Sequence, residues 1–320
     1  MRYSLRAELV LVCAFSAVVF VAVAGARVDQ KPKPLSGTIT ADGSSTVGPF
    51  TQAAAEGFRT RQRNVRITVG ISGTGGGFER FCRGETDLSN ASRPMKNSEA
   101  IICRDKGVKW VAFTVANDGL SVVVNKDNTW ATCLTVAELK KVWEPGSKVN
   151  NWSDIRSGFP NVGLKLFGAG TDSGTFDYFT EAINGKAKAS RSDYLATEDD
   201  NIVVQGVTGE RGGMGYFGFS YYEENKDKLK VLAIDQGKGQ GCVTPSLATV
   251  QANKYRPLSR PLFIYAKRDS FKRAAVAAFI GYIFNNEKTI ATKADFIPLT
   301  ERQLKKARYQ YKQALKQAFG

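Results

Sequence analysis

Histidine is absent from this chain of 320 residues. Its absence excludes a Ser-His-Asp triad, a Cys-His nucleophile pair and any metal site that depends on imidazole ligands. Cysteine is scarce, with five in the whole chain, and no two of them have the C-x-x-C spacing that is typical of zinc sites and redox pairs. We therefore expect no metal, no cofactor and no catalytic residues, although carboxylate or lysine chemistry is not excluded by these absences.

Long apolar runs are also missing, apart from one at the start of the chain. The eighteen residues from Leu9 to Ala26 carry no charge and follow two arginines. Alternating small residues at the end of the run offer A-x-A cleavage sites. Residues 1–26 are therefore predicted to be a secretory signal peptide and residues 27–36 a linker. An uncleaved anchor is the alternative, because about eighteen residues are near the lower limit for crossing a bilayer.

Four cysteines remain after this leader, and an even number in an exported chain points to disulfides. Three pairings are possible, and free buried thiols are the alternative. Closeness in the sequence favours Cys82 with Cys103, which leaves Cys133 with Cys242.

Acidic residues are fewer than basic ones, with 30 Asp and Glu against 45 Lys and Arg and a net charge of +15. This excess favours anionic ligands and speeds their approach. The basic residues are scattered and form no arm or stripe interleaved with aromatics, so nucleic acid is not expected as a partner. An adhesive role for the basic surface is a further alternative.

Short apolar runs alternate with helical patterns from Ser36 onward, as in "VRITVG" before "GGFERFCRG". A repeated strand-then-helix order predicts an α/β fold with largely parallel sheets. The runs "VKWVAFTVA" and "LSVVVN" are predicted to be two strands around a turn at residues 117–119. "TVAELKKVW" predicts a helix with a capping box between Thr135 and Glu138, and "SRPLFIYAK" predicts a strand before a helix over residues 271–285.

Three of the predicted strand-to-helix turns are built from Gly, Ser and Thr, at residues 42–46, 72–77 and 170–175. The first turn of a helix leaves backbone N–H groups unpaired and carries a partial positive charge. Glycine lets the backbone approach an oxyanion closely, and hydroxyl groups add donors. Ordinary N-capping explains any single loop, but three in one exported chain favour a shared tetrahedral anion.

A fourth polar element is "ETDLSNASRPM", in which Arg93 follows Ser92 and precedes Pro94. The proline restricts the backbone at Arg93 to an extended form. A guanidinium fork beside hydroxyl-bearing loops suits a doubly charged oxyanion. The alternative for Arg93 is a surface ion pair with Glu85 or Asp87.

Eight segments, in the same order, resemble the phosphate-binding proteins of bacterial phosphate ABC transporters, the PstS family, and its cyanobacterial-type branch in particular. The resemblance covers nearly the whole chain from Gly37 to Lys267. It implies a type II periplasmic-binding-protein fold, with two α/β lobes, a ligand cleft and two crossing hinge segments. The segments are "ADGSSTV", "GTGGGFERFCRGETDLSNASRPM", "NDGLSVVVN", "LTVAELKKVW", "GTDSGTFDYFTEAI", "SRSDY...EDDN", "GYFGFSYYEENKDKLK" and "PLSRPLFIYAK".

The resemblance also implies the bounds of the lobes. Residues 37–117 and 265–320 would form lobe I, and residues 118–264 would form lobe II with the hinge segments. The crossings are expected near Asn117–Ser121 and Leu258–Ile264.

The function implied by the resemblance is high-affinity binding of inorganic phosphate in the periplasm. A monomer would deliver the ligand to the membrane permease of an ABC transporter. The alternatives are a secreted binder of another oxyanion and a secreted phosphatase. The phosphatase lacks a visible base, because Ser92 and Lys96 are four residues apart rather than the three of S-x-x-K.

Site residues are carried over by position. In the middle loop Thr74 is preferred to Ser72, because its spacing to Asp87 needs no gap. The predicted phosphate-binding residues are Ser45, Thr46, Thr74, Ser92, Arg93, Ser173, Gly174 and Thr175.

The sequence departs from the better-known members at two positions. Those proteins have an aspartate where Arg93 stands, which accepts the proton of hydrogen phosphate, and an arginine where Ala169 stands. Without a carboxylate acceptor a site loses its means of preferring protonated phosphate to sulfate. Asp42, Asp118 and Asp172 are the candidate replacements, and Asp118 is preferred because it lies at the predicted hinge.

Overall fold

The computed structural model describes residues 1, 34–171, 173–197 and 199–319. The predicted signal peptide beyond Met1, most of the predicted linker, and the candidate acceptor Asp172 lie outside these residues. Pro34–Gly320 forms one compact unit. None of the helices within the described ranges is long and apolar enough to cross a membrane.

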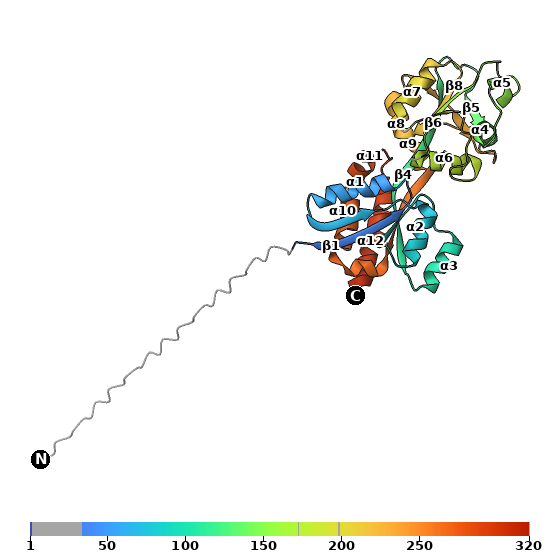
Figure 1. Cartoon of the computed structure of the whole chain (residues 1–320). Helices are drawn as coiled ribbons and strands as arrows, with labels where there is room; N and C mark the ends of the chain where they lie inside the picture. Colours follow the sequence, from blue (N-terminus) through green and yellow to red (C-terminus); the bar gives the residue numbers. More distant parts are fainter. Residues whose placement is uncertain (2–33, 172, 198, 320) are drawn as a thin grey trace. The chain divides into compact units, whose positions relative to one another are not determined.

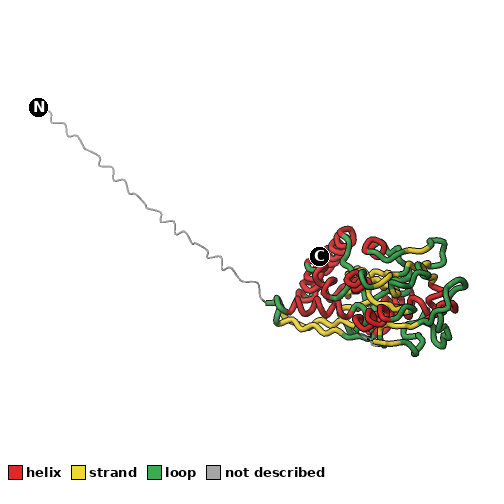
Figure 2. The backbone as a smooth tube through the Cα atoms, turned by 90° about the horizontal axis from the view of Figure 1, so that it is seen from above, coloured by secondary structure: helices red, strands yellow, loops and turns green. Residues whose placement is uncertain are grey.

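Strands and helices alternate along this unit (Figures 1 and 2). The strands are β1 (Ser36–Gly43), β2 (Asn64–Val69), β3 (Leu88–Ala91), β4 (Trp110–Asn125), β5 (Cys133–Thr135), β6 (Lys165–Ala169), β7 (Leu195–Thr197), β8 (Gly213–Gly218), β9 (Leu229–Val231), β10 (Ala233–Asp235), β11 (Cys242–Val243) and β12 (Ser259–Lys267). The helices are α1 (Gly48–Arg59), α2 (Gly73–Cys82), α3 (Asn97–Asp105), α4 (Val136–Trp143), α5 (Trp152–Ile155), α6 (Gly174–Asn184), α7 (Asp200–Gly209), α8 (Phe219–Asn225), α9 (Leu247–Gln251), the 3-10 helix η1 (Arg268–Lys272), α10 (Ala274–Asn285), α11 (Glu287–Lys293) and α12 (Glu301–Phe319).

Most strands join one long sheet in the order β2-β1-β3-β12-β4-β8-β6-β7, with β9 also paired to β4. Pairing is parallel at both ends of this sheet, where β1 lies between β2 and β3 and where β6 lies between β7 and β8. In the middle, β12 and β4 run antiparallel to their neighbours. The predicted α/β fold is therefore confirmed. In the order of the long sheet, the antiparallel pairs are those made by β4 and β12, the strands that cross between the two halves.

The crossing strand β4 is one continuous strand, so the prediction of two strands around a turn at residues 117–119 is wrong. Up to Gly119 it pairs with β12, and from Leu120 it pairs with β8. Asn117, a residue that favours turns, is held in the strand because its N–H and C=O pair with Ile297 at 2.8 and 3.0 Å. Tertiary hydrogen bonds thus override the local preference of the turn-type residues.

The two largest hydrophobic cores lie on either side of this crossing. One combines side chains from near the start and the end of the chain, such as Phe50 and Phe279. The other comes mainly from the middle of the chain and includes Trp143, with Tyr216 stacked on Phe179 at a centroid distance of 3.7 Å. The chain therefore builds one lobe from its two ends and the second from its middle, as the colours of Figure 1 show.

Both predicted disulfides are formed. Cys82 is bonded to Cys103, which ties α2 to α3, and Cys133 is bonded to Cys242, which ties β5 to β11. Each bond lies within one lobe, so neither disulfide links the two halves of the molecule.

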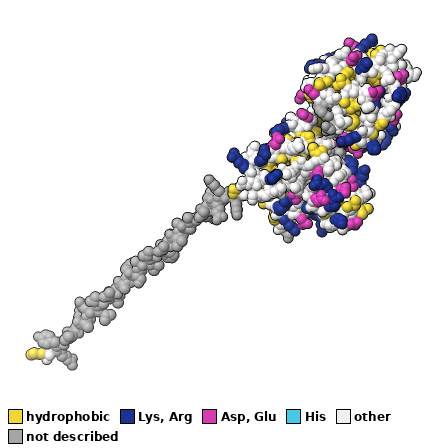
Figure 3. Space-filling model, viewed as in Figure 1, with side chains coloured by type: hydrophobic (Ala, Val, Ile, Leu, Met, Phe, Trp, Pro, Cys, Tyr) yellow, Lys and Arg dark blue, Asp and Glu magenta, His cyan; other side chains and the backbone are white. Residues whose placement is uncertain are grey.

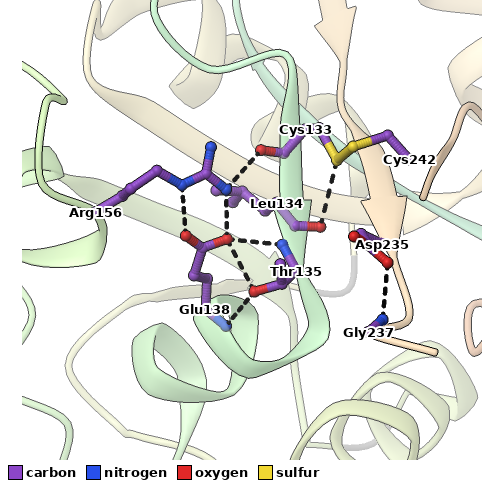
Figure 4. Close-up of a disulfide and its surroundings, with 8 residues drawn as sticks. All are labelled: Cys133, Leu134, Thr135, Glu138, Arg156, Asp235, Gly237 and Cys242. Carbon is purple, nitrogen blue, oxygen red and sulfur yellow. Dashed lines mark hydrogen bonds and ion pairs between the residues drawn. A yellow bond between two sulfur atoms is a disulfide. The ribbon is translucent and has the colours of Figure 1, made fainter. Parts of the chain in front are cut away.

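The predicted capping box lies close to the second disulfide (Figure 4). The Thr135 hydroxyl accepts from the N–H of Glu138 at 3.1 Å, and the Glu138 carboxylate accepts from the N–H of Thr135 at 2.7 Å. Arg156 donates to the same carboxylate at 2.6 Å. These bonds begin α4 and join it to α5, since Arg156 is the residue that follows that helix.

One face of the molecule carries charges of both signs. On the face shown in Figure 3, lysine and arginine side chains are interspersed with aspartate and glutamate. The excess of basic residues is therefore spread over this face.

Candidate functional site

The three loops rich in Gly, Ser and Thr lie at the N-terminal ends of long helices. α1 begins at Gly48 after the first loop, α2 begins at Gly73 after the second, and α6 begins at Gly174 after the third. Each loop follows the carboxyl end of a strand that pairs in parallel, namely β1, β2 and β6. Ligands of open α/β sheets bind at this edge, where helix N-termini supply N–H donors.

A cavity of about 220 Å³ lies where the first two loops face α6. Five of the eight predicted phosphate-binding residues line it. Its lining residues are Ser44, Ser45, Thr46, Gly73, Thr74, Gly75, Ser92, Arg93, Asp177, Tyr178, Glu181, Ala187 and Arg260.

The other three predicted residues line a neighbouring cavity of about 430 Å³. These are Ser173, Gly174 and Thr175, and Asp118 lines the same space. Ser45 and Thr46 line both cavities. The predicted set is therefore brought to one region, but it is divided between two adjoining spaces.

Direct contact between the two lobes separates these cavities. The Thr46 hydroxyl donates to the carbonyl of Gly174 at 3.2 Å. A β-carbon on Gly174 would lie 2.8 Å from both Cα and N of Thr46. Such a distance is too short for a side chain, so the close approach of the two loops requires glycine at position 174.

Of the two candidates in the middle loop, Thr74 lines the cavity and Ser72 does not. The Thr74 hydroxyl lies 3.0 Å from that of Ser92 and accepts from the N–H of Ser92 at 3.3 Å. Ser72 instead uses its backbone N–H to donate to Asp42. Thr74 and Ser92 thus form one hydroxyl pair on the wall formed by the first lobe.

Arg93 lines the cavity, but its guanidinium fork is occupied by Glu99. The two guanidinium nitrogens Nη1 and Nη2 donate to the Glu99 carboxylate at 2.9 and 2.8 Å, and Nη1 also donates to the carbonyl of Pro94. Burial raises the pKa of Glu99. The bonds from Arg93 and from a backbone N–H together lower this pKa by more than burial raises it, so the pair is ionised. The predicted alternative partners, Glu85 and Asp87, pair with other arginines.

A second arginine of the cavity, Arg260, was not predicted as a site residue. It lies on β12, and its side chain is only 12% exposed. Nη2 donates to the Thr46 hydroxyl at 3.0 Å, and Nε donates to Asp118 at 3.4 Å. Its carbon Cζ lies 3.3 Å from the centroid of the Tyr178 ring. The available signal in the sequence was its place in the second predicted crossing segment.

The candidate proton acceptors predicted from the sequence have partners of their own. Asp42 is buried and accepts from the N–H groups of Gly43 and Ser72 and from Arg80. Asp118 is buried beside Arg260. Burial raises the pKa of Asp118 above its ordinary value, and the nearby guanidinium only partly opposes that rise.

A different carboxylate, Asp177, faces the cavity from the first turn of α6. Its oxygen Oδ2 accepts from the Ser45 hydroxyl at 3.0 Å. Its second oxygen, Oδ1, is buried and has no hydrogen-bond partner among the described residues. No motif in the sequence pointed to Asp177, because it follows the predicted triplet inside an ordinary helix.

The chain is similar to known proteins over most of its length. A family model described as a PBP superfamily domain matches residues 29–287. Protein SphX of Synechococcus elongatus is 50% identical over 263 residues, which are 82% of this chain and 77% of that protein. Phosphate-binding protein PstS of Staphylococcus saprophyticus is 38% identical over 269 residues, which are 83% of this chain and 82% of that protein. The chain belongs to the PBP superfamily, and within it to the family of the SphX and PstS proteins.

Solved structures agree on the fold. A possible phosphate binding protein from Planctomyces limnophilus is 49% identical, with a TM-score of 0.86, and the match covers 88% of this chain and 99% of that one. An ABC-type phosphate transport receptor from Vibrio cholerae is 21% identical, with a TM-score of 0.64, over 81% of this chain and 99% of that one. The type II periplasmic-binding-protein fold is therefore confirmed.

Proposed function

We propose that this protein is a substrate-binding subunit that captures inorganic phosphate outside the cytoplasmic membrane and delivers it to the permease of an ABC transporter. The observation that carries the proposal is the cavity in which the N-terminal loops of α1 and α2 meet α6 beside two arginines. The names of the relatives support phosphate as the anion, since one at 38% identity is a phosphate-binding protein PstS.

Within this proposal, the cavity supplies the donors that an oxyanion needs. The loops offer backbone N–H groups at helix N-termini and the hydroxyls of Thr46, Thr74 and Ser92. Arg260 provides the buried positive charge. Two of its five N–H donors hold Thr46 and Asp118, which leaves others for the ligand. Arg93 adds a second positive charge, although Glu99 partly neutralises it.

The predicted triplet Ser173, Gly174 and Thr175 has a proposed role in closure. Gly174 touches Thr46 across the two lobes, and Ser173 caps α6 by accepting from the N–H of Thr175. We expect phosphate to favour the conformation in which these loops meet. Closure would bend β4 and β12 near Asn117–Ser121 and Leu258–Ile264, as in hinge motions of two-lobed binding proteins.

Transport without catalysis is part of the proposal. The hydroxyls of Thr74 and Ser92 hydrogen-bond each other, and the sequence has no histidine to activate them. The two disulfides fit an oxidising compartment such as the periplasm, and we expect the protein to act there as a monomer.

Equilibrium dialysis tests the proposal. The chain from Arg27 onward, freed of bound phosphate, is dialysed against radiolabelled phosphate, and against radiolabelled sulfate in parallel. We expect one phosphate per chain at micromolar concentrations, and no turnover of p-nitrophenyl phosphate. Saturation by sulfate without phosphate binding would identify another oxyanion binder, and steady release of p-nitrophenol would identify a phosphatase.

A further inference from the structure

The geometry points to Asp177 as the residue that accepts the proton of hydrogen phosphate and so sets the preference for phosphate over sulfate. This inference rests on the proposed function and names the group that makes its site selective. It also places this role on a different carboxylate from Asp118, which is the acceptor predicted from the sequence.

Asp177 lies close to the residues proposed to bind the ligand. Asp177 lies two residues after the predicted contact Thr175, and it lines the same cavity as Thr46, Thr74 and Arg260. A ligand that takes donors from these residues lies within reach of the Asp177 side chain.

One oxygen of the Asp177 carboxylate is left without a donor among the described residues. A buried acceptor that lacks a donor is costly, and Oδ1 of Asp177 is such an atom among the described residues. Its other oxygen is held by Ser45, which aims the carboxylate from the opposite loop. A ligand that carries an O–H group would satisfy Oδ1, and hydrogen phosphate carries one whereas sulfate at neutral pH carries none.

The other acidic groups near the cavity are less suited to this role. Asp42 accepts three donors, Asp118 is paired with Arg260, and Glu99 holds the fork of Arg93. Glu181 lines the cavity but is exposed to solvent. Water would screen its charge and offer it donors, so its preference between the two anions is weak.

Selectivity follows from the two states of the ligand. Hydrogen phosphate would donate its proton to Oδ1 and make a charge-assisted hydrogen bond. Sulfate would bring a fully charged oxygen against the same carboxylate and be repelled. One residue therefore strengthens binding of the protonated anion and weakens binding of the other.

Calorimetric titration tests this inference. Phosphate and sulfate are each titrated into the wild-type chain, into Asp177→Asn and into Glu181→Gln. We expect Asp177→Asn to weaken phosphate binding by about tenfold, or ~1.4 kcal/mol, and to strengthen sulfate binding. Glu181→Gln removes the same charge from the same cavity and should keep the wild-type ratio of affinities. A ratio in Asp177→Asn that stays within about twofold of the wild-type ratio overturns the inference.

Two further measurements separate the possible causes. If Asp177 only positions Ser45, then Ser45→Ala should change the affinity ratio as much as Asp177→Asn does. If it accepts the proton, Ser45→Ala should weaken both anions and keep their ratio. Arsenate, which is protonated as phosphate is, should displace phosphate from the wild-type chain far better than sulfate does. Equal displacement by the two would overturn the inference even if Asp177→Asn did not fold, whereas no phosphate binding by the wild-type chain would reject the proposed function itself.

Discussion

The guanidinium of Arg260 lies over the ring of Tyr178, with Cζ 3.3 Å from the ring centroid. Arg260 comes from the crossing strand β12, and Tyr178 comes from α6 of the second lobe. The Tyr178 hydroxyl donates to the carbonyl of Pro257 at 2.9 Å, which fixes the ring. With Thr46 and Asp118 as its other partners, Arg260 is held by both lobes and by both crossing strands.

Replacing this arginine should weaken phosphate binding strongly. We expect Arg260→Gln to weaken phosphate binding by about 100-fold, because a charge-assisted hydrogen bond contributes roughly 1.5–3 kcal/mol. Arg260→Lys should recover only part of the affinity, since lysine keeps the charge but loses the planar fork and the stacking. Calorimetric titration of phosphate measures both variants.

A matched control for this experiment is Arg211→Gln. Arg211 also lies over an aromatic ring, that of Trp130 at 5.5 Å, but it does not line the cavity of Arg260. The variant Arg211→Gln should leave the phosphate affinity unchanged. Wild-type affinity in Arg260→Gln would remove Arg260 from the site.

Gly174 is predicted to be required for closure and not for folding. Gly174→Ala places a methyl group against the backbone of Thr46, so phosphate binding should fall by at least about tenfold. The free protein should be as stable as the wild type or slightly more so, because alanine favours a helix by about 1 kcal/mol over glycine. Titration of phosphate and thermal unfolding without phosphate measure the two effects.

Gly185 at the other end of α6 supplies the opposite control. It has a φ of 83° as the helix C-cap, where an L side chain is strained. Gly185→Ala should lower the stability by about 1 kcal/mol and leave phosphate affinity unchanged. If Gly174→Ala lost stability and kept its affinity, the contact with Thr46 would be structural only.

Asp87 is expected to make the stability of the protein depend on pH in acid. Burial raises the pKa of Asp87. Hydrogen bonds from Arg273, Thr40 and Ser270 together lower this pKa by more than burial raises it, so that it lies below the ordinary 3.8. The folded state therefore favours the ionised form. This stabilisation is fully present above pH 3.8 and is lost as the pH falls through the lower pKa of the folded state.

Urea unfolding of the wild type and of Asp87→Asn between pH 7 and pH 3 measures this effect. Asp87→Asn should lower the free energy of unfolding by about 1–3 kcal/mol at pH 7, and the difference should shrink as the pH falls below 3.8. Asp269→Asn, at an exposed carboxylate paired with Lys272, should change little at any pH. A difference for Asp87→Asn that is constant over the whole range would contradict the assigned pKa shift.

The two disulfides should stabilise the protein to different degrees. Cys133 and Cys242 are separated by 109 residues, and Cys82 and Cys103 by 21. Loop-closure entropy gives about 4.7 kcal/mol for a loop near 100 residues and about 3 kcal/mol for a short one. Replacing each pair by alanine should therefore lower the urea midpoint more for the long loop. Phosphate affinity should be unchanged in both, since none of the four cysteines lines the two cavities.

Local patterns in the sequence were sufficient to predict much of the fold. The alternation of strands and helices, the capping box at Thr135, both disulfides and the convergence of loops rich in Gly, Ser and Thr depend on short-range preferences or on the resemblance to a family. The error at Asn117 has a tertiary cause, because the bonds that keep this residue in a strand come from Ile297 near the end of the chain.

The two site residues that the sequence did not predict, Arg260 and Asp177, were also missed because their contacts are tertiary. Arg260 reaches Thr46 across 214 positions of sequence, and Asp177 reaches Ser45 across 132. Each stands within a segment whose pattern is fully explained as a strand or a helix, so only the folded arrangement reveals its place in the cavity. The partner of Arg93 was missed for a different reason, because Glu99 is only six residues away and pairs with it from α3.

Isothermal titration calorimetry of phosphate into the phosphate-free chain tests the central claim most directly. We predict a single site per chain that is saturated at micromolar phosphate, and an affinity lower by about 100-fold in Arg260→Gln. Absence of phosphate binding in the wild-type chain, or equal affinity for sulfate, would contradict the account.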